Sequence, residues 1–307
     1  MDLNSTDLPL GLRQKDAGAI RSHFRTLLSS NKPMVVPGAA NALGARLIQR
    51  SGFESFFVTG AGLANSEYAL PDIGLLSLTD LCNETSKILD ATDLPAIIDA
   101  DTGFGGPLSV MRTVHQLERL GATAIQLEDQ VMPKRCGHFE DKAVIDCDSM
   151  IQKLDAAQRA RSDPNLVIIA RTDARAVTGL EDAIQRGLAY ADAGADAIFV
   201  EAPQSIDELA QIGTALQGVP LVVNIVEGGK TPRLPVSDLA DLGFNIILYA
   251  NFLLRAMVYA GEQALIHLNS AGTSEGFAFP ILPWEDRQKL VDLNIYDNVA
   301  KHFPETH

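Results

Sequence analysis

Short apolar runs alternate along this chain with longer segments in which hydrophobic residues recur every three or four positions. The short runs are rich in β-branched residues and predict eight strands, at 33–38, 55–60, 95–101, 123–129, 166–173, 196–202, 220–227 and 245–250. The segments between them, such as 180–194, place their apolar residues on one helical face. Strands that alternate with helices pair in parallel, and eight such units predict a closed (β/α)₈ TIM-type barrel.

A repeated unit supports the barrel. A glycine stands where each of several predicted helices gives way to a strand, at Gly52, Gly121, Gly194 and Gly243. Seven residues after these glycines come Thr59, Glu128, Glu201 and Ala250. The same place in the unit therefore recurs at the carboxyl end of a strand, where such barrels keep their chemistry. An open, doubly wound sheet uses the same units and remains the alternative.

The chain shows no linker that divides it, so we expect a single domain over residues 1–307. A helix at about 16–30 precedes the first strand, and we expect it to pack across the end of the barrel. A helical tail at about 283–307 follows the eighth helix.

Charge and composition narrow the class of partner. The net charge of -14 argues against nucleic acid and anionic membranes, and no apolar run approaches a membrane span of roughly 20 residues. The three cysteines form no CxxC pair, and the N-terminus lacks the pattern of a signal peptide, so we expect a cytoplasmic protein. A small anionic substrate remains compatible, because local cations or a metal ion can override the global field.

Carboxylates gather at the predicted carboxyl ends of neighbouring strands. Asp99 and Asp101 end the third strand, Glu128 the fourth and Glu201 the sixth. Converging carboxylates stay ionised only beside a counter-charge, and hard oxygen ligands with room for water suit Mg²⁺. Arg171, at the end of the fifth strand, cannot neutralise all of them. We therefore expect a Mg²⁺ site, with an ion-pair network around Arg171 as the alternative.

Two glycine-containing segments follow strands two and three. In TGAG, residues 59–62, a hydroxyl followed by small residues leaves backbone N–H groups free to hold a carboxylate, although a plain tight turn looks the same. DADTGFGG, residues 99–106, lacks the lysine and spacing of a phosphate loop. We interpret it as a metal-ligand loop.

One cysteine stands among cations. Cys136 lies in the segment 130–147 after strand four and is flanked by Lys134, Arg135, Gly137 and His138. The cations lower the pKa of a thiol and attract a carboxylate substrate. A long loop on a compact barrel is often a functional lid. We expect Cys136 to be a catalytic thiol and not a core residue, and Cys82 and Cys147 to be structural.

Several motifs together resemble the isocitrate lyase/phosphoenolpyruvate mutase superfamily over nearly the whole chain, from about Val36. They are EDQVMPKRCGH, DADTGFGG, ARTDA, VEAP and NIVEGGKTP. The K-R-C-G-H segment is typical of the carbon–carbon lyase branch. Within that branch the sequence is similar to 2,3-dimethylmalate lyases, the plant petal death protein and methylisocitrate lyases.

The resemblance implies a role for each candidate residue. Asp101 corresponds to the metal ligand, and Asp72, Asp99 and Glu128 to residues that hold metal-bound water. Arg171 corresponds to the arginine on the oxyanion of the 2-oxo acid, and Cys136 to the proton donor, with Lys134 and His138 beside it. The substrate pocket would use Thr59, Gly60, Ala61, Arg135, Gly137, Glu201, Asn224, Glu227 and Gly228.

The function implied is that of a Mg²⁺-dependent carbon–carbon bond lyase, with Mn²⁺ able to substitute for Mg²⁺. The substrate would be a 2-hydroxydicarboxylate such as 2,3-dimethylmalate or 2-methylisocitrate, cleaved into a 2-oxo acid such as pyruvate plus a carboxylate. The resemblance also implies a homo-oligomer, a tetramer built as a dimer of dimers, whose subunits exchange the eighth helix.

Some positions depart from the family pattern and keep other activities open. Methylisocitrate lyases tend to have tyrosine where this chain has Phe57 and histidine where it has Gln126. Oxaloacetate hydrolases tend to have serine where it has Arg233. Decarboxylation or hydrolysis of oxaloacetate is the main alternative. A phosphonate mutase or hydrolase is disfavoured by Cys136, and a non-catalytic scaffold is disfavoured because the matched positions remain chemically competent.

Overall fold

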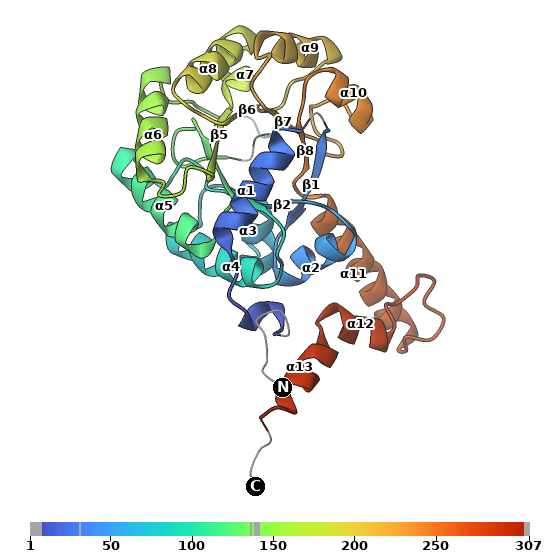
Figure 1. The fold of residues 1–307 in the computed structure, drawn as a ribbon. Coiled ribbons are helices and arrows are strands. Elements are labelled where there is room, and N and C mark those ends of the chain that lie inside the picture. Colours follow the sequence, from blue (N-terminus) through green and yellow to red (C-terminus); the bar gives the residue numbers. More distant parts are fainter. Residues whose placement is uncertain (1–7, 31, 136, 138–141, 304–307) are drawn as a thin grey trace.

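A computed structural model describes residues 8–30, 32–135, 137 and 142–303. Eight parallel strands pair in chain order and close into a barrel (Figure 1). They are β1 (Met34–Ala39), β2 (Phe56–Val58), β3 (Ala96–Asp99), β4 (Ala124–Glu128), β5 (Val167–Thr172), β6 (Ala197–Val200), β7 (Leu221–Asn224) and β8 (Ile246–Tyr249).

Helices surround the barrel, and a 3₁₀ turn, η2 (Leu10–Leu12), precedes them. The first seven helices are α1 (Ala17–Leu28), α2 (Ala42–Arg50), α3 (Gly60–Tyr68), α4 (Leu78–Asp90), α5 (Pro107–Leu120), α6 (Cys147–Ala160) and α7 (Ala174–Val177). They are followed by α8 (Leu180–Asp192), α9 (Ile206–Ala215), α10 (Val236–Asp241), α11 (Phe252–Ala271), α12 (Trp284–Leu290) and α13 (Leu293–Ala300).

The fold class predicted from the sequence is confirmed. β1 extends one residue beyond the predicted 33–38, and the other strands lie within their predicted ranges. The open sheet is excluded because β1 pairs with β8 as well as with β2. This closure brings the carboxyl ends of all the strands to one mouth.

Alternate strand residues face two separate apolar cores, as the two-residue period of a strand requires. On β3, Ile97 belongs to the cluster inside the barrel, whereas Ile98 packs in the cluster beneath the helices. Phe24 and Leu28 of α1 belong to the inner cluster. Helix α1 therefore closes one end of the barrel (Figure 1), which leaves the other end for the polar strand termini.

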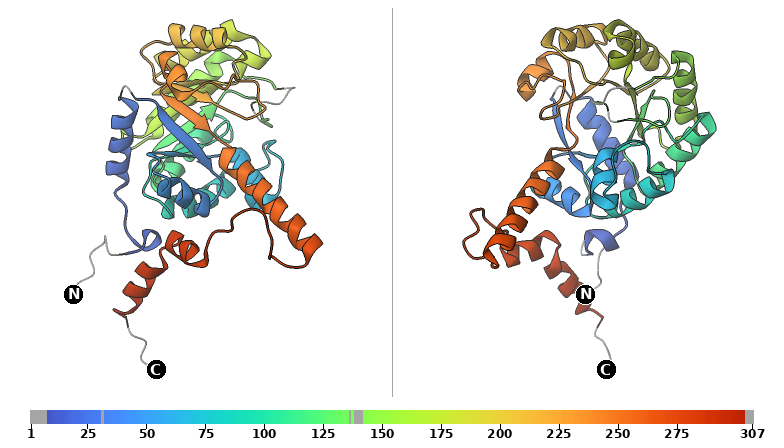
Figure 2. Two further views of the ribbon diagram at one scale, coloured as in Figure 1. Left: turned by 90° about the vertical axis from the view of Figure 1, so that its right-hand side faces the viewer. Right: turned by 180° about the vertical axis from the view of Figure 1, so that it is seen from behind.

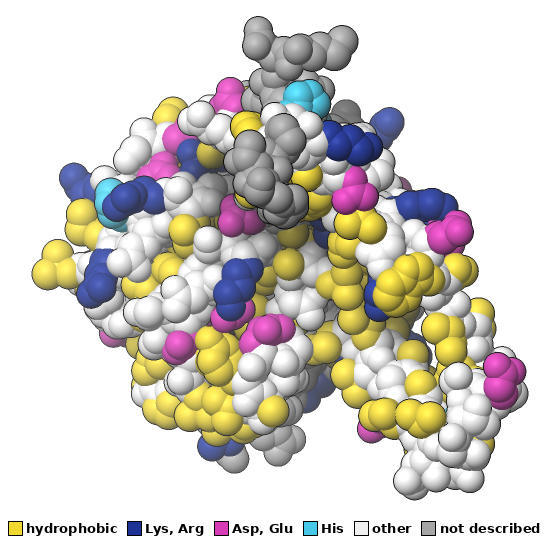
Figure 3. All heavy atoms as spheres, turned by 90° about the horizontal axis from the view of Figure 1, so that it is seen from below, with side chains coloured by type: hydrophobic (Ala, Val, Ile, Leu, Met, Phe, Trp, Pro, Cys, Tyr) yellow, Lys and Arg dark blue, Asp and Glu magenta, His cyan; other side chains and the backbone are white. Residues whose placement is uncertain are grey.

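Helix α11 extends away from the barrel, unlike the other long helices, which pack around it (Figure 2). None of its 20 residues is buried. The part of the molecule that projects with α11, at the lower right of Figure 3, carries hydrophobic side chains on its surface. Among the described residues, no helix has the length and apolar character needed to cross a bilayer.

Candidate active site

The carboxylates predicted for a metal site lie at the mouth of the barrel. β3 ends at Asp99, and the chain then turns sharply, with Asp101 at φ 47° and Gly103 at φ 80°. Non-glycine residues are uncommon in this left-handed region, and they cluster at functional sites. β4 ends at Glu128 beside them. The strand ends thus aim buried carboxylates at one place.

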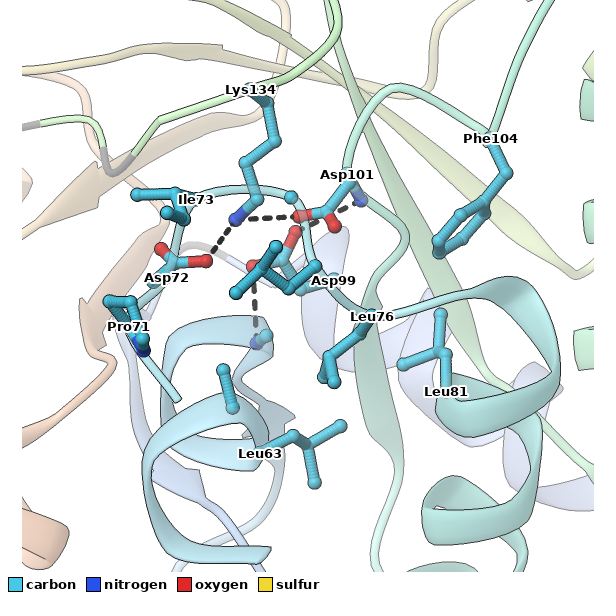
Figure 4. A pocket seen from close by; sticks show the side chains of 14 residues that line it. Leu63, Pro71, Asp72, Ile73, Leu76, Leu81, Asp99, Asp101, Phe104 and Lys134 are labelled. Carbon is cyan, nitrogen blue, oxygen red and sulfur yellow. Dashed lines mark hydrogen bonds and ion pairs between the residues drawn. The ribbon is translucent and has the colours of Figure 1, made fainter. Parts of the chain in front are cut away.

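A lysine ammonium lies between two of these carboxylates (Figure 4). Lys134 Nζ is 2.8 Å from Asp101 Oδ1 and donates a short hydrogen bond to Asp72. The side chain of Lys134 is only 5% exposed, so the pair is well shielded from water. The cavity that these residues line has a volume of about 10 Å³, the space of a single water molecule.

Asp99 is held by hydrogen bonds from three sides. Its Oδ2 accepts the backbone N–H of Gly60 at 3.3 Å. Its Oδ1 accepts the side-chain amide of Gln126 at 3.2 Å and the N–H of Asp101 at 3.3 Å. Gln126, the residue that departs from the methylisocitrate lyase pattern, therefore supports Asp99 directly.

The cluster is short of positive charge. Burial raises the pKa of Asp101 to about 6, and Lys134 only partly offsets this effect. Burial also raises the pKa of Glu128 well above its usual value, against the opposing effect of Arg171. Burial alone would lower the pKa of Lys134, but Asp101, the other strand-end carboxylates and Asp72 raise it above its ordinary value. The carboxylates therefore favour a further cation.

Arg171 lies on the other side of Glu128. Its Nε is 2.9 Å from Asp173 Oδ2 and 3.4 Å from Glu128 Oε2, and its Nη1 is 3.6 Å from Glu201 Oε2. The guanidinium also lies over the ring of Phe199, 5.3 Å from its centre. Burial would lower the pKa of Arg171, but Asp173, Glu201 and Glu128 raise it well above its usual value. The guanidinium is permanently charged and fixed in direction.

Asp173 and Asp129 form the support behind Arg171, and neither was assigned a role from the sequence. Asp173 accepts two hydrogen bonds from Arg171, and its own N–H donates to Asp129 Oδ1 at 2.9 Å. Asp129 Oδ2 accepts the hydroxyls of Thr172 at 2.7 Å and Tyr190 at 2.9 Å. Residues 171 and 173 lie on the same side of an extended chain, and this periodicity was the available signal.

The segment after β4 is described up to Arg135, at Gly137 and again from Lys142. Gln130 and Arg135 exchange two hydrogen bonds of 2.8 Å, which closes a compact turn. Gly137 is buried against Arg171 and Glu201. The proposed acid Cys136 and the neighbouring His138 lie outside the described residues.

Thr59, Gly60 and Ala61 lie at the start of α3, as the proposed carboxylate-binding turn requires. Thr59 caps this helix by accepting the N–H of Gly62 at 3.2 Å, and its hydroxyl donates to Asn251 Oδ1 at 3.2 Å. Helix N-termini favour anions because their first N–H groups have no partner within the helix.

The remaining pocket candidates divide into two places. The buried Oδ1 of Asn224, at the end of β7, has no hydrogen-bond partner among the described residues. Glu227 lies instead against α11, where its backbone oxygen accepts Arg255 Nη1 at 2.8 Å. Neither Glu227 nor Gly228 lines the cavity around Lys134.

Within the described part of the chain, no three His, Cys, Asp or Glu side chains meet closely enough to bind one metal ion. The ammonium of Lys134 lies among the carboxylates that the sequence assigned to the metal. Glu128 Oε1 is buried without a hydrogen-bond partner among the described residues. A buried acceptor of this kind needs a donor or a cation, so the donor set itself remains suited to a metal ion.

The arrangement can now be compared with known proteins. The family model described as phosphoenolpyruvate phosphomutase matches residues 24–269, which is most of the chain and includes every strand of the barrel. The chain belongs to the phosphoenolpyruvate phosphomutase family. The resemblance to this superfamily expected from the motifs is confirmed.

The curated relatives of this family member include lyases. The 2,3-dimethylmalate lyase of Eubacterium barkeri is 43% identical over 81% of this chain and 84% of its own length. A probable 2-methylisocitrate lyase of Corynebacterium glutamicum is 42% identical, and the alignment covers 92% of both chains. These similarities agree with the carbon–carbon lyase branch predicted from the K-R-C-G-H segment.

Solved structures show the same fold with related chemistry. An oxaloacetate acetylhydrolase in complex with 3,3-difluorooxalacetate has a TM-score of 0.88 and 32% identity, covering 94% of this chain and 98% of its own. A phosphonopyruvate hydrolase in complex with oxalate and Mg²⁺ has a TM-score of 0.83 and 30% identity, covering 92% and 99%. The fold thus accommodates several reactions of small acids.

Proposed function

We propose that this protein is a Mg²⁺-dependent lyase that cleaves the C2–C3 bond of a 2-hydroxydicarboxylate of the 2-alkylmalate type. The products are a 2-oxo acid such as pyruvate and a second carboxylate. The observation that carries the proposal is the meeting of a buried, cation-poor carboxylate cluster with the fixed guanidinium of Arg171 at one barrel mouth. The identity of over 40% to a 2,3-dimethylmalate lyase supports it.

The metal would be held by Asp101, with Asp72, Asp99 and Glu128 acting through bound water. The raised pKa values of Asp101 and Glu128 and the unpartnered Glu128 oxygen support a divalent cation at this place. When bound, Mg²⁺ would polarise the C2 hydroxyl and adjacent carboxylate and compensate the charge that develops on them. Asp101→Ala should then abolish activity at ordinary Mg²⁺ concentrations.

Arg171 supplies the second stabilising group. Its guanidinium is buried and oriented by Asp173 before any substrate binds, so its donors need little reorganisation during the reaction. We assign it to the C2 oxygen, which gives its hydroxyl proton to a base and becomes a carbonyl as the electron pair of the C2–C3 bond moves to C3. The turn of Thr59, Gly60 and Ala61 at the start of α3 would hold the carboxylate on C2, with the N–H of Ala61 as a donor beside the N–H of Gly60 that Asp99 accepts.

Bond cleavage leaves an electron pair on C3, which must receive a proton. We assign the proton to the thiol of Cys136, which acts as a general acid. Arg135 and His138 in the same segment would attract the distal carboxylate of the substrate and stabilise the thiolate left behind. The ammonium of Lys134, in the same segment, pairs with Asp72 and Asp101.

The choice of products separates this proposal from its main alternative. Cleavage of 2,3-dimethylmalate yields pyruvate and propionate, whereas hydrolysis of oxaloacetate yields oxalate and acetate. The similarity to oxaloacetate acetylhydrolase favours testing the second reaction. We propose a panel of 2,3-dimethylmalate, 2-methylisocitrate, citramalate and oxaloacetate with Mg²⁺, with products identified by NMR. The account predicts cleavage of a 2-alkylmalate; exclusive production of oxalate and acetate would establish the hydrolase instead.

We further propose that two subunits exchange α11. A barrel helix that follows β8 normally packs over β8 and β1, but here that surface is an apolar groove of about 420 Å³. Its lining includes Val35 and Pro37 of β1 and Tyr249 of β8, and only the first turn of the chain's own α11, Phe252 and Leu253, reaches it. Helix α11 exposes large apolar side chains, among them Leu265 at 67% and Ile266 at 63%. The α11 of a second copy would cover this groove, and a dimer of such dimers would form the tetramer.

A further inference from the structure

Lys142 is a buried ammonium that the proposed mechanism does not use. Its side chain is only 1% exposed. Its Nζ donates to the backbone oxygen of Gly137 at 2.5 Å and to Asp173 Oδ1 at 2.7 Å. Burying an ammonium is costly unless it is paired and hydrogen-bonded, so these two partners define where the side chain lies.

One partner of Lys142 is the carboxylate that orients Arg171. Asp173 is fully buried and accepts Arg171 Nε at 2.9 Å and Nη2 at 3.1 Å. Burial would raise the pKa of Asp173, but Arg171 and Lys142 lower it below its usual value. Two cations therefore share one carboxylate, while Arg171 also pairs with Glu128 and Glu201.

The other partner is the residue that follows Cys136. Gly137 lies so close to the site that a Cβ on it would be 2.5 Å from Arg171 Nη2 and 2.7 Å from the side-chain carbons of Glu201. The carbonyl of Gly137 is thus bound, through Lys142, to the same carboxylate that holds Arg171.

We propose that Lys142 is a positioning residue for the lyase reaction. Its ammonium ties the Gly137 carbonyl to Asp173, so that the backbone beside the proposed proton donor keeps a fixed place relative to Arg171. This inference rests on the proposed function and adds a residue to it. Lys142 acts through Gly137 and Asp173 and does not contact the substrate.

The two buried lysines of this segment have separate tasks. Lys134 pairs with Asp72 and Asp101 on the metal side, whereas Lys142 pairs with Asp173 on the arginine side. A change at Lys142 should therefore leave binding of the metal unchanged. This separation gives the experiment an internal reference.

The test compares Lys142→Met, which keeps the length of the side chain without its charge, with Lys142→Arg, which keeps the charge. Lys142→Met should lower kcat by about 10- to 100-fold, the usual effect of losing a supporting partner, with a smaller change in KM. Lys142→Arg should recover part of the loss. Mg²⁺ affinity, measured by calorimetry, should match that of the wild type in both variants.

A matched control is Lys15→Met. Lys15 is a partly buried lysine that donates to the backbone oxygens of Leu89 and Thr92, close to the amino end of β3 and so far from the barrel mouth. The Lys15→Met variant should be less stable than the wild type but should show no comparable loss of kcat. Equal losses of kcat in Lys142→Met and Lys15→Met would reduce Lys142 to a structural residue and overturn the inference.

Hydrogen exchange gives a readout that does not depend on activity. Peptides containing Gly137 should exchange faster in ligand-free Lys142→Met than in the wild type, while Lys15→Met leaves them unchanged. If the wild type cleaves no member of the substrate panel, the proposed function fails. The exchange comparison then still shows whether Lys142 holds Gly137 in place. Unchanged exchange at Gly137 in Lys142→Met, or a kcat of this variant within twofold of the wild type, would overturn the inference.

Discussion

At the scale of single residues, the site depends on a balance between buried carboxylates and few cations. The sequence was sufficient to predict Asp99, Asp101, Glu128 and Arg171 at neighbouring strand ends, because parallel strands in a barrel end at one mouth. It could not place Lys134 among the carboxylates. That contact depends on the path of the chain after β4, which strand periodicity does not determine.

Protons should compete with the metal at Asp101. The pKa of its carboxyl is about 6 because of burial, so the group is mostly ionised at pH 7.5 and mostly protonated at pH 5. A metal ion needs the ionised form, so the apparent Mg²⁺ affinity should fall about tenfold per pH unit below pH 6. Calorimetric titrations at pH 5, 6 and 7.5 measure this dependence. Equal affinities at pH 5 and 7.5 would contradict the assigned ligand.

The thiol of Cys136 should act as an acid and not as a nucleophile. Cys136→Ser keeps the size of the side chain but raises the pKa of the donor far above the thiol value of about 8.5. We expect kcat to fall roughly 10²- to 10⁴-fold, the usual contribution of a general acid, with a smaller change in KM. Bound Mg²⁺ should be unaffected. Mass spectrometry of enzyme quenched during turnover should find no substrate fragment on Cys136, and such an adduct would make the thiol a nucleophile.

At the scale of elements, the segment after β4 connects the carboxylate cluster to Arg171. Its importance was predictable from the cations around Cys136, since a core residue rarely stands in so charged a loop. Its anchoring was not predictable, because the contacts of Gly137 and Lys142 reach Arg171 of β5 and the turns that follow β5 and β6. Such contacts exist only after the barrel has closed.

Gly137 should not tolerate a side chain. A Cβ at this position would lie 2.5 Å from Arg171 Nη2, so Gly137→Ala must displace either the segment or the guanidinium. Displacements of this size cost up to about 100-fold in rate, and we expect kcat/KM to fall accordingly. Gly18→Ala is the matched control, because its added Cβ meets only Asp16 at an ordinary 3.4 Å. Steady-state kinetics of both variants decide the point, and equal kcat/KM values would remove the packing argument.

At the scale of the whole molecule, the barrel was predictable because helix and strand periods alternate without interruption. The closing helix α1 followed from its place before the first strand. The direction of α11 was not readable from periodicity, because an apolar helical face looks the same whether it packs on its own barrel or on another. The groove beside β1 and β8 supports the second arrangement.

A charged surface on α11 should break the assembly. The double variant Leu265→Glu and Ile266→Glu places charges on side chains that are exposed in a single subunit, so the barrel should still fold. Light scattering should show a smaller oligomer than the wild type, because the charges would be buried in the exchanged groove. Leu108→Glu on α5, where the side chain is 81% exposed, is the control and should keep the native mass. An unchanged mass for the double variant would exclude the exchange.

The central claim is that this barrel breaks a carbon–carbon bond and protonates the resulting carbanion. NMR of the purified protein with 2,3-dimethylmalate and Mg²⁺ in D₂O tests this claim most directly. The account predicts pyruvate and propionate in equal amounts, with one solvent deuterium at C2 of the propionate and no reaction in excess EDTA. Full cleavage in excess EDTA, or a failure to cleave any 2-alkylmalate while oxaloacetate is converted into oxalate and acetate, would contradict it.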